Sequence, residues 1–153
     1  MMKPILPIVV AGLSLMLLAG CSTPGAYKTR SELVSDPAAC GAKRFEVYFD
    51  QDQARLTTAA REAIGLTATQ LQGCDITRVQ VLGLADARTG TAASNQSLSE
   101  RRARSVAEAL AGVGLPAPAF EVAAAGAEGA VVNGVNDPLR RRTEVVIEAQ
   151  PRR

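Results

Sequence analysis

Apolar residues recur along the middle of the chain at two different intervals, and these intervals predict where strands and helices lie. Residues 45–49 alternate apolar and polar side chains, which predicts a half-buried strand ending at Asp50. Residues 57–72 place apolar side chains three or four positions apart, which predicts a helix with Thr57 or Thr58 as N-cap and Gly73 as C-cap. A second strand is predicted over residues 78–84.

The second predicted helix has the clearest periodicity. Its apolar positions step by three, four and three residues and form one stripe toward the core: Ala103, Val106, Leu110 and Val113. Charged residues occupy its other faces: Glu100, Arg101, Arg104 and Glu108. A third strand is predicted to begin at Phe120 and a fourth to cover residues 143–149, with a long functional loop over residues 126–138 between them. The resulting order, βαβαββ, predicts an α/β sandwich whose helices pack on a sheet.

The start of the chain has the pattern of an export signal. Lys3 precedes an apolar stretch over residues 5–19, which is shorter than the roughly 20 residues of a membrane span. The residues Leu18-Ala19-Gly20-Cys21 resemble the lipobox of bacterial lipoproteins, in which the cysteine is acylated and the chain is cut just before it. We therefore expect a signal peptide over residues 1–20, a lipidated N-terminus and flexible tether over residues 21–39, and a folded domain over residues 40–150. The alternative is an ordinary signal peptide with an unrelated cysteine, or an uncleaved anchor helix.

Composition contributes mainly by exclusion. The 153 residues suffice for one domain, and 17 Lys and Arg against 15 Asp and Glu give a net charge of +2, which argues against a nucleic-acid binder. Histidine is absent, which removes the commonest general base and every histidine-containing metal site. Tryptophan is absent and aromatic residues make up only 3%, so we expect no base-stacking platform. We expect neither an enzyme nor a cofactor.

The three cysteines divide into one and a pair. If Cys21 carries lipid, Cys40 and Cys74 remain as an even pair in an oxidising compartment. They flank the first predicted strand and helix, so a disulfide between them is expected. Two buried free thiols are the alternative, and a zinc site is disfavoured because two thiols without histidine offer an incomplete set of ligands.

Five separated motifs agree in order and spacing with one family. They are Tyr48-Phe49-Asp50 for Y-F-D, residues 83–86 (GLAD) for G-H-T-D, Gly90 in the following loop, residues 95–103 for N-x-x-L-S-x-x-R-A, and residues 140–144 (RRRTE) for N-R-R-V-E. On these motifs the sequence resembles the OmpA-like, or peptidoglycan-associated lipoprotein, domain family over residues 40–149. The resemblance implies two helices packed on a four-stranded mixed sheet, and binding of the diaminopimelate residue of the peptidoglycan stem peptide.

The resemblance also implies a site. The free end of the diaminopimelate side chain is a zwitterion, so Asp86 would take its ammonium and Arg102 its carboxylate through a bidentate fork. Four further residues would line the site: Phe49, Asp50, Asn95 and Leu98. The run Arg140, Arg141 and Arg142 is either a secondary contact to anionic glycan or phosphate, or an exposed basic strand edge that discourages strand pairing.

Each site residue also has a purely structural interpretation. Asp86 would then hydrogen-bond backbone amides in its turn, and Arg102 would pair with Glu100 or Glu108 as a solvated helix charge. Phe49 and Leu98 would be core residues, and Asn95 a turn or cap residue.

The sequence departs from the family pattern around the expected site. Leu84 replaces the family His, Ala85 replaces the family Thr, and Arg140 replaces the family Asn, while one extra residue separates Asp86 from Asn95. These changes motivate an alternative function: an interaction module with weakened wall binding that serves as a subunit of an envelope secretion, pilus or division complex.

The expected function is that of an outer-membrane lipoprotein that tethers the membrane to the cell wall, because Ser22 after the cysteine favours the outer membrane. Its expected partners are peptidoglycan, membrane lipid through acylated Cys21, and envelope proteins of a Tol-Pal-like or secretion system, with no nucleic acid.

Overall fold

A computed structural model describes residues 40–152 of the chain. The expected signal peptide, the Cys21 lipidation site and the tether lie outside the described residues. The main elements are the strands β1 (Lys43–Tyr48), β2 (Cys74–Gly83), β3 (Phe120–Ala124) and β6 (Arg142–Pro151), and the helices α2 (Thr58–Gln70) and α3 (Ala92–Gly112). Among residues 40–152, no helix is long and apolar enough to cross a membrane.

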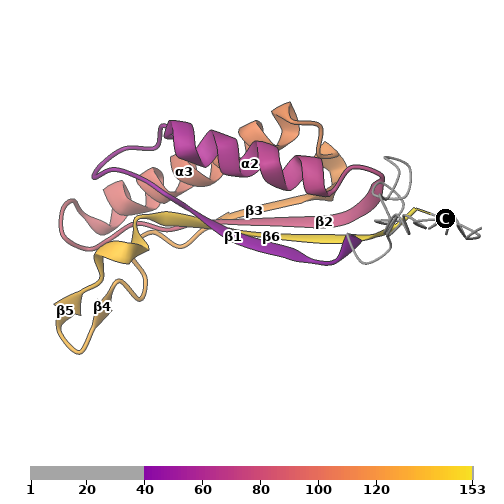
Figure 1. Ribbon diagram of the computed structural model, residues 1–153. Coiled ribbons are helices and arrows are strands. Elements are labelled where there is room, and N and C mark those ends of the chain that lie inside the picture. The colour runs from indigo at the N-terminus through magenta and orange to yellow at the C-terminus, as the bar shows by residue number, and fades with distance from the viewer. Residues whose placement is uncertain (1–39, 153) are drawn as a thin grey trace, which may run out of the picture.

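The four main strands form one mixed sheet in the order β1-β6-β2-β3. The pair β2 and β3 is parallel, while β6 runs antiparallel to both of its neighbours. Both helices lie on the same face of this sheet and leave its other face open (Figure 1). The predicted α/β fold with two helices on a four-stranded mixed sheet is therefore confirmed.

The core lies between the helices and the sheet. Val79 and Val81 of β2 point to the helix side, where they meet the predicted stripe of α3, and the buried positions of this stripe are Ala103, Val106 and Leu110. Burying such side chains contributes about 1.5–3 kcal/mol each for the larger ones. The fourth predicted stripe residue, Val113, is 43% exposed because it is the C-cap of α3 and lies beyond the last helical turn.

The ends of the helices follow local sequence. The hydroxyl of Thr57 accepts a hydrogen bond from the backbone of Ala60 and caps α2, as predicted. α2 ends at Gln70, two residues before the predicted end, and Gly73 makes the turn into β2 with a φ of 84° that suits glycine. Thr91 and Ser94 form a reciprocal capping box at the start of α3.

The segment predicted as a long functional loop over residues 126–138 contains additional structure. Strands β4 (Val131–Val132) and β5 (Val135–Asn136) form a hairpin, and the 3-10 helix η3 (Pro138–Arg140) follows it. The turn residues Asn133 and Gly134 both have positive φ, as a two-residue hairpin turn requires. The hairpin projects from the body of the domain (Figure 1). The prediction of a long loop missed this hairpin because two-residue strands are too short to show a period.

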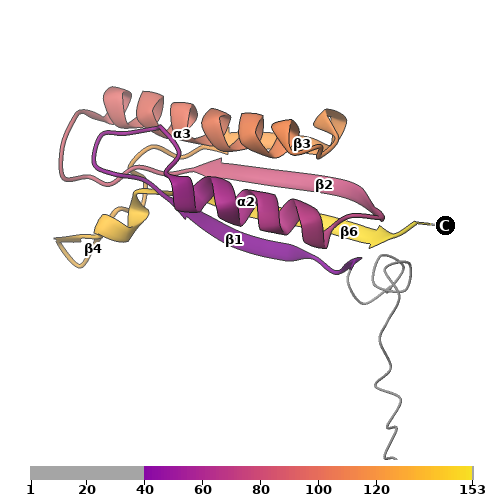
Figure 2. The same cartoon turned by 45° about the horizontal axis from the view of Figure 1, so that its top comes forward.

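The predicted disulfide is confirmed: Cys40 and Cys74 are bonded, with Cα atoms 5.5 Å apart. It joins the segment before β1 to the first residue of β2. We call this end of the sheet, defined by Cys40 and Cys74, the disulfide end. The strands β1 and β2 both run from it to the opposite end, where both helices begin (Figure 2).

Candidate functional site

The end of the sheet opposite the disulfide brings together three separate segments. They are the loop after β1, the loop after β2 and the turn that leads into β6. Asp86 follows β2, Arg141 precedes β6, and Arg102 projects from α3. We call this end, defined by Asp86, Arg102 and Arg141, the charged end.

Arg102 is fully buried and holds the charged end together. Its Nε donates to the carbonyl oxygen of Gln53 at 2.8 Å, and its Nη2 donates to that of Asp50 at 3.1 Å. Its Nη1 donates to the carbonyl oxygen of Leu84 at 2.9 Å. One side chain therefore joins the loop after β1 to the end of β2. The interpretation of Arg102 as a solvated charge paired with Glu100 or Glu108 is wrong.

The surroundings of Arg102 combine an aromatic ring with opposing charges. Its guanidinium carbon lies 5.1 Å from the centroid of the Phe49 ring, a distance at which the ring face attracts a cation. Burial holds the pKa of Arg102 below its ordinary value, while the charge of Asp86 opposes this shift and that of Arg141 adds to it. Arginine stays protonated in such surroundings, so the site keeps a fixed buried cation beside Asp86.

Asp86 is paired with an arginine other than Arg102. Its side chain is only 6% exposed, and its Oδ2 lies 3.2 Å from Nη1 of Arg141, whose side chain is 27% exposed. The next residue, Ala87, donates its backbone N–H to Oδ1 of Asn136 on β5. Within the described residues, Asp86 makes this ion pair rather than the hydrogen bonds to turn amides that the structural interpretation predicts.

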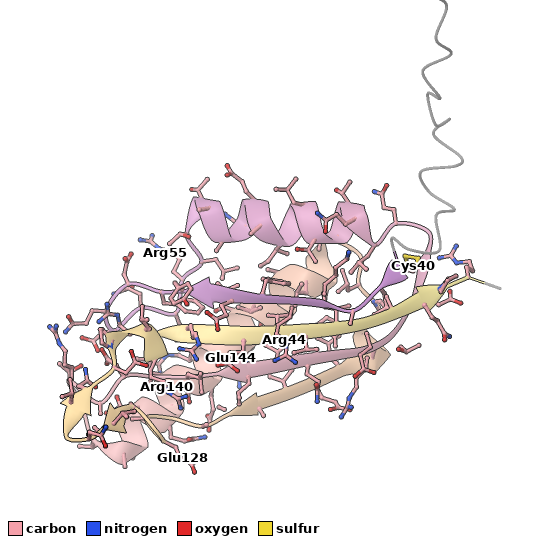
Figure 3. The ribbon with its side chains drawn as sticks, turned by 60° about the horizontal axis from the view of Figure 1, so that its bottom comes forward. Cys40, Arg44, Arg55, Glu128, Arg140 and Glu144 are labelled. Carbon is pink, nitrogen blue, oxygen red and sulfur yellow. A yellow bond between two sulfur atoms is a disulfide. The ribbon has the colours of Figure 1, made fainter. Side chains whose placement is uncertain are left out.

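The three consecutive arginines point to three different places. Arg140 donates to the carbonyl oxygen of Glu128 at the base of the hairpin, where both residues lie (Figure 3). Arg141 pairs with Asp86. Arg142 lies on the open face between Glu46 at 3.3 Å and Glu144 at 2.7 Å. The interpretation of this run as a basic strand edge is wrong, because β6 lies between β1 and β2.

The other predicted site residues lie on the segment after β1 and on α3, which carries Arg102. Phe49 and Leu98 are buried, and Phe49 belongs to the core as well as contacting Arg102. Asn95 is buried beside Gly90, where an added Cβ would meet the Asn95 Oδ1 at 3.0 Å and where φ is 83°. Asp50 contributes its carbonyl oxygen while its side chain is exposed.

Leu84 and Ala85, the two departures from the family pattern before Asp86, are both buried. The backbone N–H groups of both residues are nevertheless paired. The N–H of Leu84 donates to the carbonyl oxygen of Arg142 at 2.9 Å, and that of Ala85 donates to Gly126 at 2.7 Å. The backbone therefore positions Asp86 without needing polar side chains at these two positions.

A small polar hollow of about 230 Å³ adjoins the charged end. It is lined by Asp50, Gln53, Arg55, Leu56, Thr57, Thr58 and Arg61. Sequence reasoning did not identify Gln53 or Asn136 as part of this region, because each acts there through a backbone or amide group that no motif marks. Among residues 40–152, no group of three or more Cys, Asp or Glu side chains is arranged to hold a metal ion.

Comparison with known proteins agrees with this arrangement. The family model described as OmpA family matches residues 48–144, more than half of the chain. An outer membrane protein of Gluconacetobacter diazotrophicus is 33% identical over 114 residues, which cover 69% of this chain and 30% of that protein. The chain thus spans less than a third of the length of that curated relative.

Two solved structures share the fold. The peptidoglycan-associated lipoprotein of Burkholderia pseudomallei superimposes with a TM-score of 0.59 at 27% identity, covering 69% of this chain and 91% of that one. The cell wall anchor of the T6SS from Pseudomonas aeruginosa superimposes with a TM-score of 0.58 at 21% identity, covering 71% of this chain and 82% of that one. The second likeness concerns the fold alone.

Proposed function

The chain belongs to the OmpA family, and on that premise we propose that it binds peptidoglycan non-covalently through the diaminopimelate residue of the stem peptide. The observation that carries the proposal is that a buried carboxylate, Asp86, and a buried cation, Arg102, lie at the same end of the sheet, where the charge of each acts on the other. The name of the peptidoglycan-associated lipoprotein, which is 27% identical, supports peptidoglycan as the ligand.

The two charges suit the zwitterion at the free end of the diaminopimelate side chain. Asp86 accepts hydrogen bonds from the ligand ammonium. Arg102 has five N–H donors and uses three of them on carbonyl oxygens. Because Arg102 is fully buried in the unliganded domain, the remaining two can meet a ligand carboxylate only after a neighbouring side chain moves aside. Phe49, Asp50, Asn95 and Leu98 line the site around these two groups in this proposal.

The same proposal includes the membrane anchor. Residues 1–20 act as a lipoprotein signal, Cys21 is acylated, and residues 21–39 connect the outer membrane to a domain in the periplasm. The disulfide end lies opposite the charged end (Figure 2), which supports a tether that leaves the site facing away from its anchor. The domain in this role holds its ligand and performs no reaction.

Co-sedimentation of the purified chain with isolated sacculi in mild detergent tests this function. The wild type is expected to pellet with sacculi, and Asp86→Ala and Arg102→Ala are each expected to weaken binding by about 2 kcal/mol or more, about 30-fold in Kd. Two matched controls are expected to bind like the wild type: Asp75→Asn, from the exposed pair with Arg152, and Arg101→Gln, from the exposed contact with Ser97. Circular dichroism checks the folding of every variant.

A second candidate function is that of an interaction module in an envelope secretion, pilus or division complex. One observation favours it: four apolar side chains on and after the hairpin are 53–69% exposed, namely Val131, Val132, Val135 and Leu139. Wild-type protein that stays in the supernatant at moderate salt would contradict wall binding and favour this second function.

A further inference from the structure

The carboxylate that would receive the ligand is already occupied in the unliganded domain. Asp86 Oδ2 pairs with Arg141 Nη1 at 3.2 Å, and the Asp86 side chain is almost inaccessible to water. Among the described residues Arg141 is the side chain that pairs with this carboxylate, so a ligand ammonium that binds Oδ2 takes the place of Arg141. The following inference concerns this exchange and rests on the proposed function.

The neighbouring arginines cannot substitute for Arg141. Arg140 is held against the carbonyl oxygen of Glu128, and an added Cβ at Gly129 would lie 3.5 Å from its Nη2. Arg142 is shared between Glu46 and Glu144 on the open face. Arg141 is therefore the member of the run that faces Asp86.

Only the side chain of Arg141 is free to move. Its backbone N–H donates to the carbonyl oxygen of Pro138, and its own carbonyl oxygen accepts from the N–H of Phe49 at 2.9 Å. Its side chain is the more exposed partner of the ion pair, so turning toward solvent costs Arg141 less than losing a partner costs Asp86. The pair can therefore open on the side of Arg141 while Asp86 stays in place.

We propose that the ligand zwitterion exchanges with the internal ion pair: its ammonium replaces Arg141 on Asp86, and Arg141 turns to the ligand carboxylate, which it binds together with Arg102. No charge is left without a partner after the exchange. A ligand with an ammonium alone would displace Arg141 without giving it a new partner. A ligand with a carboxylate alone would not replace Arg141 on Asp86.

Arg141 is thus a specificity-determining residue for ligands that carry an ammonium and a carboxylate on the same carbon. Stem peptides with meso-diaminopimelate have this group at the end of the side chain, whereas those with L-lysine have the ammonium without the carboxylate. The exchange predicts that the domain distinguishes these two walls, and that Arg141 is responsible for much of the difference.

Binding of the full chain to two kinds of sacculi tests the inference. The sacculi contain either meso-diaminopimelate or L-lysine at the same stem position and are stripped of covalently attached polymers. The wild type is expected to prefer the diaminopimelate wall by about tenfold or more, because a charged hydrogen bond is worth about 1.5–3 kcal/mol. Arg141→Gln is expected to lose most of this preference, Arg141→Lys to keep part of it, and Arg101→Gln to keep it all.

A second measurement uses the wild type alone and does not depend on the folding of a variant. Free meso-diaminopimelate is expected to displace the chain from diaminopimelate sacculi, while cadaverine, which has only ammonium groups, and pimelate, which has only carboxylates, are not. Equal competition by cadaverine or pimelate would overturn the exchange.

The two proposals fail in different ways. Wild type that binds neither kind of sacculus contradicts the proposed function itself. Wild type that binds and discriminates, together with folded Arg141→Gln that discriminates equally well, contradicts only the role of Arg141 and leaves the proposed function standing.

Discussion

At the disulfide end, the bond between Cys40 and Cys74 joins the starts of β1 and β2, and Leu71 and Leu115 pack there. At the charged end, Arg102 joins the loops that follow these same two strands. The first end is held by a covalent bond and apolar contacts, with the exposed ion pair of Asp75 and Arg152 beside them, and the second by buried hydrogen bonds and a partly buried ion pair. In the proposed exchange, a ligand replaces Arg141 on Asp86 at the second end, whereas the covalent bond of the first end stays closed.

Removing the disulfide tests the disulfide end and has the largest expected effect on the free energy of unfolding. Cys40→Ser combined with Cys74→Ser opens a loop of 34 positions, and the chain-entropy relation gives a loss of about 4 kcal/mol in the free energy of unfolding. Urea denaturation measures this loss. Sacculus binding of the folded double variant is expected to be unchanged, and weaker binding by folded protein would contradict the independence of the two ends.

Replacing Arg102, the central residue of the charged end, tests how that end is held together. Arg102→Met fills a similar volume but leaves the carbonyl oxygens of Asp50, Gln53 and Leu84 without their donor, at a cost of about 3 kcal/mol in unfolding free energy. Unlike loss of the disulfide, this change is also expected to abolish sacculus binding. A variant as stable as the wild type would show that Arg102 does not hold the loops together.

A substitution where β2 ends beneath α3 sharpens the comparison with a smaller effect. A Cβ at Gly83, the last residue of β2, would lie 2.0 Å from the carbonyl oxygen of Ser99, so α3 would have to move away from the sheet. We expect Gly83→Ala to cost about 2 kcal/mol, and to weaken binding because α3 carries Arg102. Gly65→Ala is the matched control, because an added Cβ there meets nothing within 4 Å. Equal stability of the two variants would contradict the close approach of α3.

The smallest expected effect lies on the open face, away from both ends. Arg78 pairs with Glu121 at 2.8 Å and holds the pKa of that carboxyl below its ordinary value of 4.5. Because the folded pKa is depressed, the pair stabilises the fold above the unfolded value and this contribution is lost as the pH falls through the folded pKa. Arg78→Ala is therefore expected to lower the thermal midpoint slightly at pH 7, and by progressively less as the pH falls below 4.5. A difference that does not shrink as the pH falls would mean that Arg78 acts through packing.

Most of the fold could be predicted from the sequence because its elements are long enough to show a period. Ala103, Val106 and Leu110 are buried as their spacing predicts. The disulfide was predicted because Cys40 and Cys74 remain as a pair once Cys21 is assigned to lipid. The hairpin was missed because each of its strands has two residues, although Asn133 and Gly134 between valines are a local turn signal.

The sequence predicted which residues form the charged end, but not their hydrogen-bond and ion-pair partners. The motifs bring Asp86 and Arg102 to one place, yet the three acceptors of Arg102 are backbone carbonyl oxygens, which carry no mark in the sequence. The direction of each arginine in the run depends on where η3 ends and β6 begins. Strand alternation places Arg142 and Glu144 on the face opposite buried Thr143, but only the turn before the strand directs Arg141 to Asp86.

The position of the disulfide also determines how the domain would carry tension. A pull applied at Cys40 and resisted by a ligand at Asp86 passes through the bond to Cys74 and then along the ten residues of β2, about 33 Å of continuous covalent chain. β6 and β3 flank this strand on both sides, so their hydrogen bonds are loaded together in shear rather than opened one by one. Without the disulfide, the same force would pass into β1 and reach the rest of the sheet only through its pairing with β6. In the proposed tether, the bond thus directs such a force along β2.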